Sequence, residues 1–330
     1  MTGTIEPILQ EICRKEGLTC RSIQTLSGGQ VNQVFLIDGQ FVVRIGGRED
    51  AFERLERETG LLQRLAGQVP VPRVLAFGRH EDLVYQIQQF APGKKLYRVW
   101  KDLPPADQET ITAELAEAMK AIHSLPAPSF GYGRADQPNY DSWAEFLSAK
   151  FYRTLDEIRE LGIRMAPGFL ELAREYFEKH RHVLEGGRPA LVHGDLTMVN
   201  VLVERGHVSA ILDFEYSLHA PSDYELFDME LFCLYPNDYA EEDWEIFCAA
   251  DFGRFFQLLQ KHYPALFDVP RLRERVDLYQ VDATLGSYLG WRKANLTAIP
   301  PERMAAKEFY MARIANFIFP HGVRMFFVSE

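Results

Sequence analysis

The sequence has few of the features that mark specialised protein classes. Its 330 residues include only four cysteines, Cys13, Cys20, Cys233 and Cys248. They form no Cys-x-x-Cys pair, and no histidine cluster has zinc-ligand spacing, so we predict no structural metal site. So few cysteines fit a reducing compartment, where they behave mostly as small hydrophobic residues. The sequence also contains no internal repeat and no low-complexity stretch.

An excess of positive charge is also missing. The chain has 36 Lys and Arg residues against 47 Asp and Glu residues, a formal net charge of -11. This balance argues against a sequence-independent nucleic-acid binder, which needs a basic footprint. The first 25 residues contain no long apolar run, so we predict no signal peptide, no transmembrane helix and a cytoplasmic protein. We expect a small-molecule substrate, no nucleic acid and no membrane partner, and the sequence predicts no oligomeric state.

Two patterns of secondary structure divide the chain. Up to residue 90, β-rich runs and an Asp38-Gly39 hairpin signal surround one amphipathic helix at 50–66. Beyond the turn at 91–93, helical periodicity dominates, interrupted by strand-like runs at 190–202 and 208–214. The segments with helical patterning are 106–123, 142–161, 167–185, 241–261, 270–290 and 301–318. We predict an α+β fold with two lobes, a β-rich N-terminal lobe with one helix (1–90) and a larger, mainly helical C-terminal lobe (91–330).

Three polar residues stand among apolar runs in the strand-like part. Asp195 is followed five residues later by Asn200, and Asp213 comes thirteen residues after that. Phosphoryl transfer needs a carboxylate beside the attacking hydroxyl and hard oxygen ligands for magnesium. Each residue alone could be a turn or cap residue, but a His-x-Asp loop with this spacing is the kinase arrangement. The spacing predicts a kinase of a small molecule, with Asp195 as catalytic base and Asn200 and Asp213 as magnesium ligands.

The same segment carries a family resemblance. His193-Gly-Asp195-x-x-x-x-Asn200, followed by Ile-Leu-Asp213-Phe-Glu, resembles the aminoglycoside phosphotransferases and their choline-kinase-like relatives. Within that family the chain looks most similar to hygromycin-type phosphotransferases, with weaker patches such as Phe-Val-Val-Arg-Ile at 41–45. The resemblance extends from about residue 25 to about residue 290. It implies a protein-kinase-like fold that binds ATP (or GTP) and Mg²⁺.

The resemblance also implies the residues that bind the nucleotide. Arg44 would contact the α- and β-phosphates and pair with Glu58 of the following helix, although Glu58 could instead lie on a solvated helix face. The backbone from Gln88 to Phe90 would face adenine. A glycine-rich turn would cover the phosphates through backbone N–H groups, unless it only closes a hairpin. That turn is formed by Ser27, Gly28, Gly29 and Gln30.

The chain departs from related kinases at two places. Glu215 stands where protein kinases have the glycine of Asp-Phe-Gly, and Ala220-Pro221 stands near the place where family members often carry Gly-Asp. The acidic residue that supports the catalytic loop in the family would then be replaced by Asp223 or Glu225. His193 is predicted to hold this loop through hydrogen bonds.

The substrate prediction depends on charge. Between Arg205 and Arg254 there is no Lys or Arg, and the 48 intervening residues include twelve acids. A cleft of one sign attracts the opposite charge, so we predict a cationic substrate such as an aminoglycoside or another amine. The family resemblance implies in addition a role in antibiotic resistance. A solvated acidic helix face is the alternative for the acids near 238–245. The candidate substrate contacts are Glu215, Asp223, Glu225 and Asp228.

Three other functions remain open from the sequence. The first is a metabolic kinase of a choline-, amino-alcohol- or sugar-like substrate. The second is a non-catalytic nucleotide-binding module, which would be marked by loss of the base or of a metal ligand, yet all three residues are present. The third is a protein kinase, for which we find no Ala-Pro-Glu-like element after Asp213.

Overall fold

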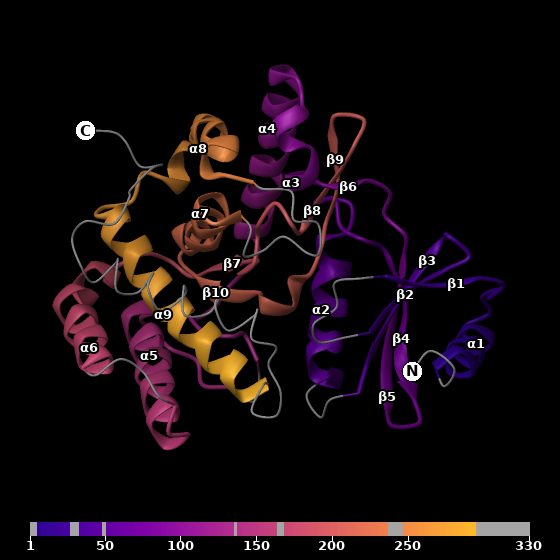
Figure 1. The fold of residues 1–330 in the computed structure, drawn as a ribbon, viewed down its shortest axis with the longest axis horizontal. Helices are drawn as coiled ribbons and strands as arrows, with labels where there is room; N and C mark the ends of the chain where they lie inside the picture. The colour runs from indigo at the N-terminus through magenta and orange to yellow at the C-terminus, as the bar shows by residue number, and fades with distance from the viewer. Residues whose placement is uncertain are drawn as a thin grey trace. The chain divides into compact units, whose positions relative to one another are not determined.

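The fold is described from a computed structural model of the chain (Figure 1). The structure describes residues 5–26, 33–47, 51–134, 137–163, 168–236 and 247–294. These residues divide into two compact units. The first unit contains the described residues of 1–121 together with 198–216, and the second contains 122–197 and the described residues beyond 216. The lobe boundary that we predicted after residue 90 stays a prediction.

The first unit is built on a five-stranded antiparallel sheet with the strand order β1-β2-β3-β5-β4. The turn between the second and third strands has positive φ at Asp38 and Gly39, which Asp and Gly tolerate better than most residues. The strands are β1 (Ile23–Leu26), β2 (Gln33–Ile37), β3 (Phe41–Gly46), β4 (Val74–His80) and β5 (Leu83–Gln89).

Alternation along these strands separates an apolar face from a polar face. Val43 and Ile45 of β3 lie in one cluster with Ile87 of β5 and the buried side of α1 (Ile5–Lys15). Successive side chains of a strand point to opposite faces, so the residues between them face the other way. That second face meets α2 (Ala51–Leu65), and Figure 1 shows α1 and α2 on opposite sides of the sheet.

A small second sheet completes the first unit. It has the order β6-β8-β9 and joins β6 (Lys94–Lys95), β8 (Val201–Glu204) and β9 (His207–Ile211). Glu114 of α4 (Pro105–His123) accepts a hydrogen bond from the Val208 backbone N–H at 2.8 Å, which ties the helix to β9. The backbone N–H of Ile211 donates to Pro70 at 2.7 Å. A short helix, α3 (Leu96–Val99), follows β6 directly.

The second unit is mainly helical. Its strands are β7 (Ala190–Val192) and β10 (Leu218–Ala220), which pair antiparallel. Buried aromatic rings link its helices, because Trp143 lies 5.0 Å from Tyr224 and 6.0 Å from Tyr279 between ring centroids. Its helices are α5 (Trp143–Glu160), α6 (Phe169–His180), α7 (Leu226–Leu234), α8 (Ala249–His262) and α9 (Leu272–Ala294).

The sequence patterns predicted most of these helices but not α7. Seven of its nine residues are buried, including a charged one, Glu230, so the helix has no polar face. Amphipathic periodicity cannot reveal a helix that is enclosed on all sides. The expected helix at 301–318 and the first six residues of the one at 241–261 lie outside the described residues.

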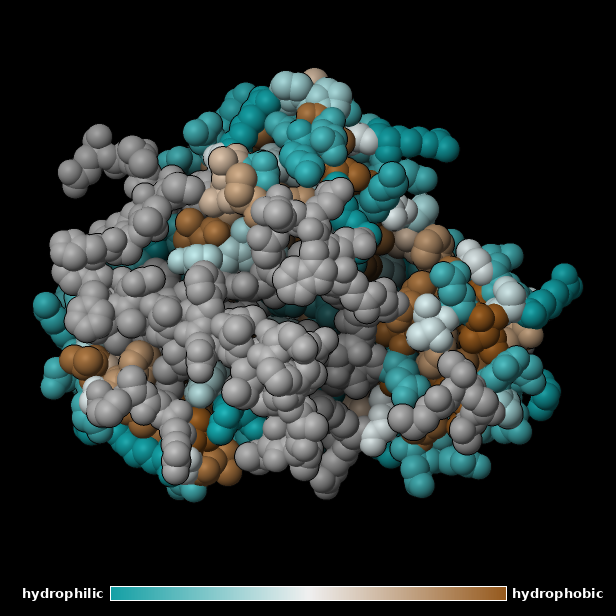
Figure 2. All heavy atoms as spheres, viewed as in Figure 1, coloured by the Kyte–Doolittle hydropathy of each residue, from teal (hydrophilic) through white to brown (hydrophobic). Residues whose placement is uncertain are grey.

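The described residues show no separation of polar from apolar residues on the face in view (Figure 2). Figure 2 shows hydrophilic residues interspersed among apolar ones on the face in view. Scattered apolar residues of this kind are normal for a globular protein. Within the part of the chain that the structure describes, none of the helices combines the length and the hydropathy needed to cross a bilayer. The described large hydrophobic residues with the greatest exposure are Leu75, Phe90, Leu161, Leu172 and Tyr216.

Candidate active site

The first unit contains a buried ion pair. Arg44 follows Val43 on β3 and therefore points to the α2 face of the sheet. There its guanidinium Nη1 lies 2.5 Å from Oε2 of Glu58, and the two side chains are only 12% and 1% exposed. The structure thus brings together the two residues expected to form the phosphate-side ion pair. Glu58 lies on the buried stripe of α2 rather than on a solvated helix face.

The ion pair also contacts the end of β9. The second oxygen of Glu58 accepts the Phe214 backbone N–H at 3.3 Å, and Arg44 Nη2 lies 3.5 Å from Asp213 Oδ1. The same nitrogen is 3.8 Å from the carboxylate of Glu215. Burial alone would lower the pKa of Arg44, but the charges of Glu58 and Asp213 more than offset it and raise that pKa. Arg44 is therefore a permanent cation that faces three carboxylates.

Glu215 is held inside this network. Its side chain is buried, and Arg57 of α2 donates a hydrogen bond to its backbone carbonyl. Burial, and then the charge of Asp213, raise the pKa of Glu215 to about 7, against the opposing charge of Arg44. The residue that replaces the glycine of protein kinases is therefore part of the packed first unit. Burial and these contacts argue against our prediction that Glu215 binds substrate directly.

Asn200 and Asp213 stand at one end of a hairpin. Asn200 precedes β8, Asp213 follows β9 after one residue, and the Leu212 backbone N–H donates to the Asn200 carbonyl at 2.8 Å. Asp213 adopts φ of 65°, a conformation uncommon for residues other than glycine, and its side chain is 38% exposed. Strained conformations of this kind recur at ligand sites.

These two residues fit a magnesium site. Mg²⁺ prefers oxygen ligands and is usually held by one or two carboxylates, water and substrate phosphates. Asn200 and Asp213 supply an amide oxygen and a partly exposed carboxylate at the same end of the hairpin. Among the described residues there is no cluster of three or more His, Cys, Asp or Glu side chains that could hold a metal without further ligands.

The catalytic loop begins in the second unit, directly after β7. His193 is fully buried, and its Nδ1 accepts the backbone N–H of Asp195 at 3.3 Å. The Thr197 backbone N–H donates to the Asp195 carbonyl at 3.0 Å. Gly194 has φ of 80°, which a glycine adopts readily. This geometry agrees with the structural role predicted for His193, and the half-buried Asp195 begins the turn that the Thr197 hydrogen bond closes.

Glu225 holds this loop through its carboxylate group. One of its carboxylate oxygens accepts the backbone N–H of His193 at 2.8 Å, and the other accepts that of Gly194 at 3.0 Å. Of the two acids proposed to support the loop, Glu225 makes the contacts. Asp223 instead pairs with Arg275 of α9 at 2.7 Å and accepts the Tyr279 hydroxyl at 3.0 Å.

The geometry changes our interpretation of the candidate substrate residues. Asp223 and Glu225 are almost completely buried, and both oxygens of each carboxylate accept hydrogen bonds from the protein. They therefore support the fold and the loop rather than contact a substrate. Asp228 is half-buried on α7 and is the remaining candidate.

The predicted adenine and phosphate contacts are only partly described. Gln88 is buried, and its side-chain amide nitrogen donates to the side-chain oxygen of Gln86 at 2.7 Å. The side chain of Phe90 is exposed. The backbone N–H groups of Gln89 and Phe90 donate to Arg73 and Gln40, both at 2.8 Å, so these donors are already used within the protein. The glycine-rich turn of Ser27, Gly28, Gly29 and Gln30 lies outside the described residues.

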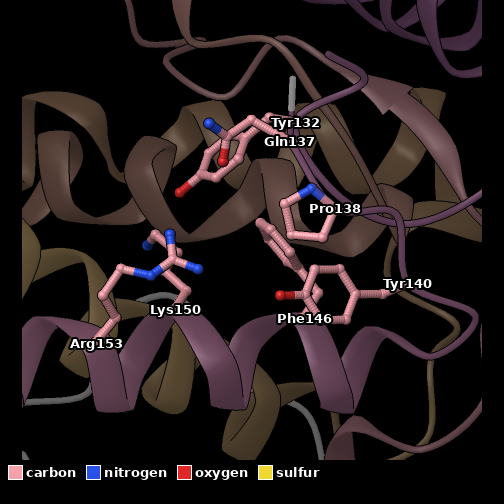
Figure 3. A pocket seen from close by; sticks show the side chains of 7 residues that line it. All are labelled: Tyr132, Gln137, Pro138, Tyr140, Phe146, Lys150 and Arg153. Carbon is pink, nitrogen blue, oxygen red and sulfur yellow. The ribbon is translucent and has the colours of Figure 1, made fainter. Parts of the chain in front are cut away.

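The second unit has a pocket beside α5 (Figure 3). Figure 3 shows Lys150 and Arg153 at one end and Pro138 and Phe146 at the other. Lys150 is paired with Asp282 of α9, whose charge raises the pKa of this lysine although burial would lower it. No carboxylate is among the described lining residues, so this pocket does not match the predicted acidic cleft. Its lining is Tyr132, Gln137, Pro138, Tyr140, Phe146, Lys150 and Arg153.

Comparison with known proteins agrees with this geometry. The profile of the phosphotransferase enzyme family (APH) matches residues 22–274. The chain belongs to this family. The family resemblance expected from the sequence is confirmed, and so is the enzyme class, a phosphotransferase.

Individual relatives share a low sequence identity with this chain. The hygromycin-B 4-O-kinase of Escherichia coli is 27% identical over 220 residues, which cover 62% of this chain and 60% of the relative. The chain thus spans less than two thirds of that curated relative. A thermostable mutant of the aminoglycoside phosphotransferase APH(4)-Ia, solved with ADP and hygromycin B, matches with a TM-score of 0.69 at 18% identity, over 97% of this chain and 100% of that one.

A second solved structure extends the comparison. The ADP-bound aminoglycoside phosphotransferase APH(2'')-Ib matches with a TM-score of 0.67 at 16% identity, over 94% of this chain and 98% of the other. At such identities the likeness shows the fold. The predicted α+β fold of aminoglycoside phosphotransferase type, with a β-sheet unit and a helical unit, is confirmed.

Several contacts of the site did not emerge from the sequence. Arg57 donates to the Glu215 carbonyl, His123 contacts Glu225, and Arg275 pairs with Asp223. Each is distant in sequence from its partner, and none belongs to a motif. A charged residue within an otherwise apolar helical stripe was the available signal for Arg275, since such a residue requires a partner when buried.

Proposed function

We propose that the protein is an ATP-dependent phosphotransferase that phosphorylates a hydroxyl group of an aminoglycoside-type small molecule. The observation that carries this proposal is the Arg44–Glu58 ion pair, which contacts the segment of Asp213 and Phe214 inside the first unit. A buried ion pair of this kind beside a candidate magnesium ligand is typical of the phosphate-binding part of a kinase site. We assign binding of the acceptor hydroxyl to the loop that carries Asp195, in the second unit.

The residues divide the chemistry among them. Asp195 would accept a hydrogen bond from the substrate hydroxyl and orient its oxygen toward the γ-phosphate of ATP. Arg44 would bind the α- and β-phosphates, and Glu58 would hold its guanidinium in place. Asn200 and Asp213 would be ligands of Mg²⁺. When bound, the metal neutralises the charge of the phosphate oxygens.

The substrate class rests on the curated relative, a hygromycin-B 4-O-kinase, and on the acidic segment between Arg205 and Arg254. Polycationic aminoglycosides complement an acidic surface. A neutral acceptor, as in a metabolic sugar or alcohol kinase, is the second candidate. It is favoured by one observation, which is that Glu215, Asp223 and Glu225 are buried and bonded within the protein.

An acceptor screen tests the proposal. Purified protein with ATP and Mg²⁺ would be mixed in turn with hygromycin B, other aminoglycosides, choline-like amines, amino-alcohols and sugars, and ADP release would be followed. Release above the acceptor-free rate with an aminoglycoside supports the first candidate, and release with sugars alone supports the second. No acceptor-dependent release with any of them, from protein that binds ATP, would overturn the proposed function.

A further inference from the structure

The support of the catalytic loop extends beyond Glu225 to a buried histidine. His123, the last residue of α4, has its Nε2 atom 3.4 Å from Oε2 of Glu225. This is the same oxygen that accepts the His193 backbone N–H. The side chains of His123 and Glu225 are 4% and 1% exposed, so solvent does not compete for this contact.

A tyrosine fixes the other side of the ring. The Tyr263 hydroxyl lies 3.1 Å from Nδ1 of His123, and Tyr263 directly follows α8. With Glu225 as acceptor at Nε2, the neutral ring would carry its proton there and accept the tyrosine O–H at Nδ1. The ends of two helices, α4 and α8, therefore meet the loop through one imidazole.

The electrostatics of Glu225 agree with an acceptor role. Burial would raise the pKa of Glu225, but the hydrogen bond from His123 and the contacts of His193 lower it overall. A carboxylate that must accept two backbone N–H groups has to stay ionised. His123 thus favours the charge state in which Glu225 can hold the loop.

We propose that His123 is a positioning residue for phosphoryl transfer, acting through Glu225 on the loop that carries Asp195. His123 contacts neither nucleotide nor acceptor in this assignment. Its effect is on the placement of Asp195, so it should change turnover more than nucleotide affinity. The kinetic part of this inference rests on the proposed function, whereas the anchoring of the loop can be measured without an acceptor.

Three variants separate the roles. His123→Ala removes the donor to Glu225, and His123→Gln retains an N–H group near the position of Nε2. His180→Ala is the matched control, because His180 also ends a helix, α6, and its Nδ1 contacts the Tyr176 carbonyl of the same helix. The glutamine variant also keeps the test decisive if the alanine variant does not fold.

The kinetic measurement compares kcat with the KM for ATP in the phosphotransfer assay. We expect His123→Ala to lower kcat by about 10- to 100-fold, the scale of loss for a misplaced catalytic group, with the KM for ATP changed less than about 3-fold. His123→Gln should recover most of kcat, and His180→Ala should match the wild type. An unchanged kcat in both His123 variants would overturn the inference, and so would an equal loss in the control.

Hydrogen exchange of the peptide around residues 191–196 provides the independent test. His123→Ala should accelerate exchange of the His193 and Gly194 amides by about 10-fold or more, because their acceptor is no longer fixed. Equal exchange in wild type and variant would overturn the inference. If the wild type phosphorylates no acceptor, the proposed function fails, and this exchange experiment still decides whether His123 anchors the loop.

Discussion

The buried carboxyl group of Glu215 should make the free energy of unfolding depend on pH. Its carboxyl group is buried beside Arg44, and burial, followed by the charge of Asp213, raises its pKa from 4.5 to about 7. Replacement by glutamine keeps the size of the side chain and removes its ability to ionise. The Glu215→Gln variant should therefore lose the pH dependence of stability that this group contributes.

The sign follows from proton linkage. Between pH 4.5 and about pH 7, the unfolded chain has released the Glu215 proton while the folded chain still holds it, so the free energy of unfolding falls as the pH rises. Below this range Glu215 contributes no penalty, and above it the penalty is complete. A pKa shift of one unit corresponds to about 1.4 kcal/mol, so ionisation of Glu215 lowers the free energy of unfolding by about 3 kcal/mol in full.

Urea unfolding without nucleotide and with a metal chelator measures this effect. From about pH 5 to about pH 8, the stability of Glu215→Gln relative to wild type should rise by about 2.5 kcal/mol, most of the full effect. Glu56→Gln is the control, because Glu56 is exposed on α2, and its effect should stay within about 0.5 kcal/mol at both values. If the difference in the free energy of unfolding between wild type and Glu215→Gln stays constant with pH, the assigned ionisation of Glu215 is refuted.

Three further variants test other contacts. Arg44→Lys cannot reproduce the guanidinium contacts to Glu58 and Asp213, and should raise the KM for ATP by about 10-fold in steady-state kinetics; an unchanged KM would contradict the phosphate role. Asp213→Ala should weaken binding of Mg-ATP more than binding of metal-free ATP in a fluorescence titration, and equal losses would move the metal site elsewhere. Arg275→Ala leaves Asp223 buried without its cation and should reduce the free energy of unfolding by about 3 to 5 kcal/mol, with a much smaller loss speaking against the pair.

Local patterns in the sequence predicted the first unit well. The Asp38-Gly39 hairpin signal and the amphipathic period at 50–66 predicted the strands and the helix that carry Arg44 and Glu58. Both are short-range signals, because strand and helix periods are visible in a few residues. The contact between Arg44 and Glu58 followed from the family resemblance, and the structure shows it.

Long-range contacts were harder to predict. Glu225 and Asp223 are two residues apart and chemically alike, yet one bonds the catalytic loop and the other bonds Arg275. Their roles depend on which partners the fold brings near them, and a single sequence does not encode this in its local pattern. The enclosed helix α7 was missed for a related reason, since its burial on all sides leaves no periodic signal.

We assign Asp195 as the base of a phosphotransferase, and the activity of the Asp195→Asn variant measures that role. With the acceptor that gives the highest activity, ADP release should fall by about 100- to 10,000-fold, the usual contribution of a general base. Affinity for Mg-ATP should stay within about 3-fold of the wild type, since Asp195 is not assigned to the nucleotide. The exposed control Asp268→Asn should keep full activity. Acceptor-dependent turnover of Asp195→Asn at near wild-type rates would contradict the account.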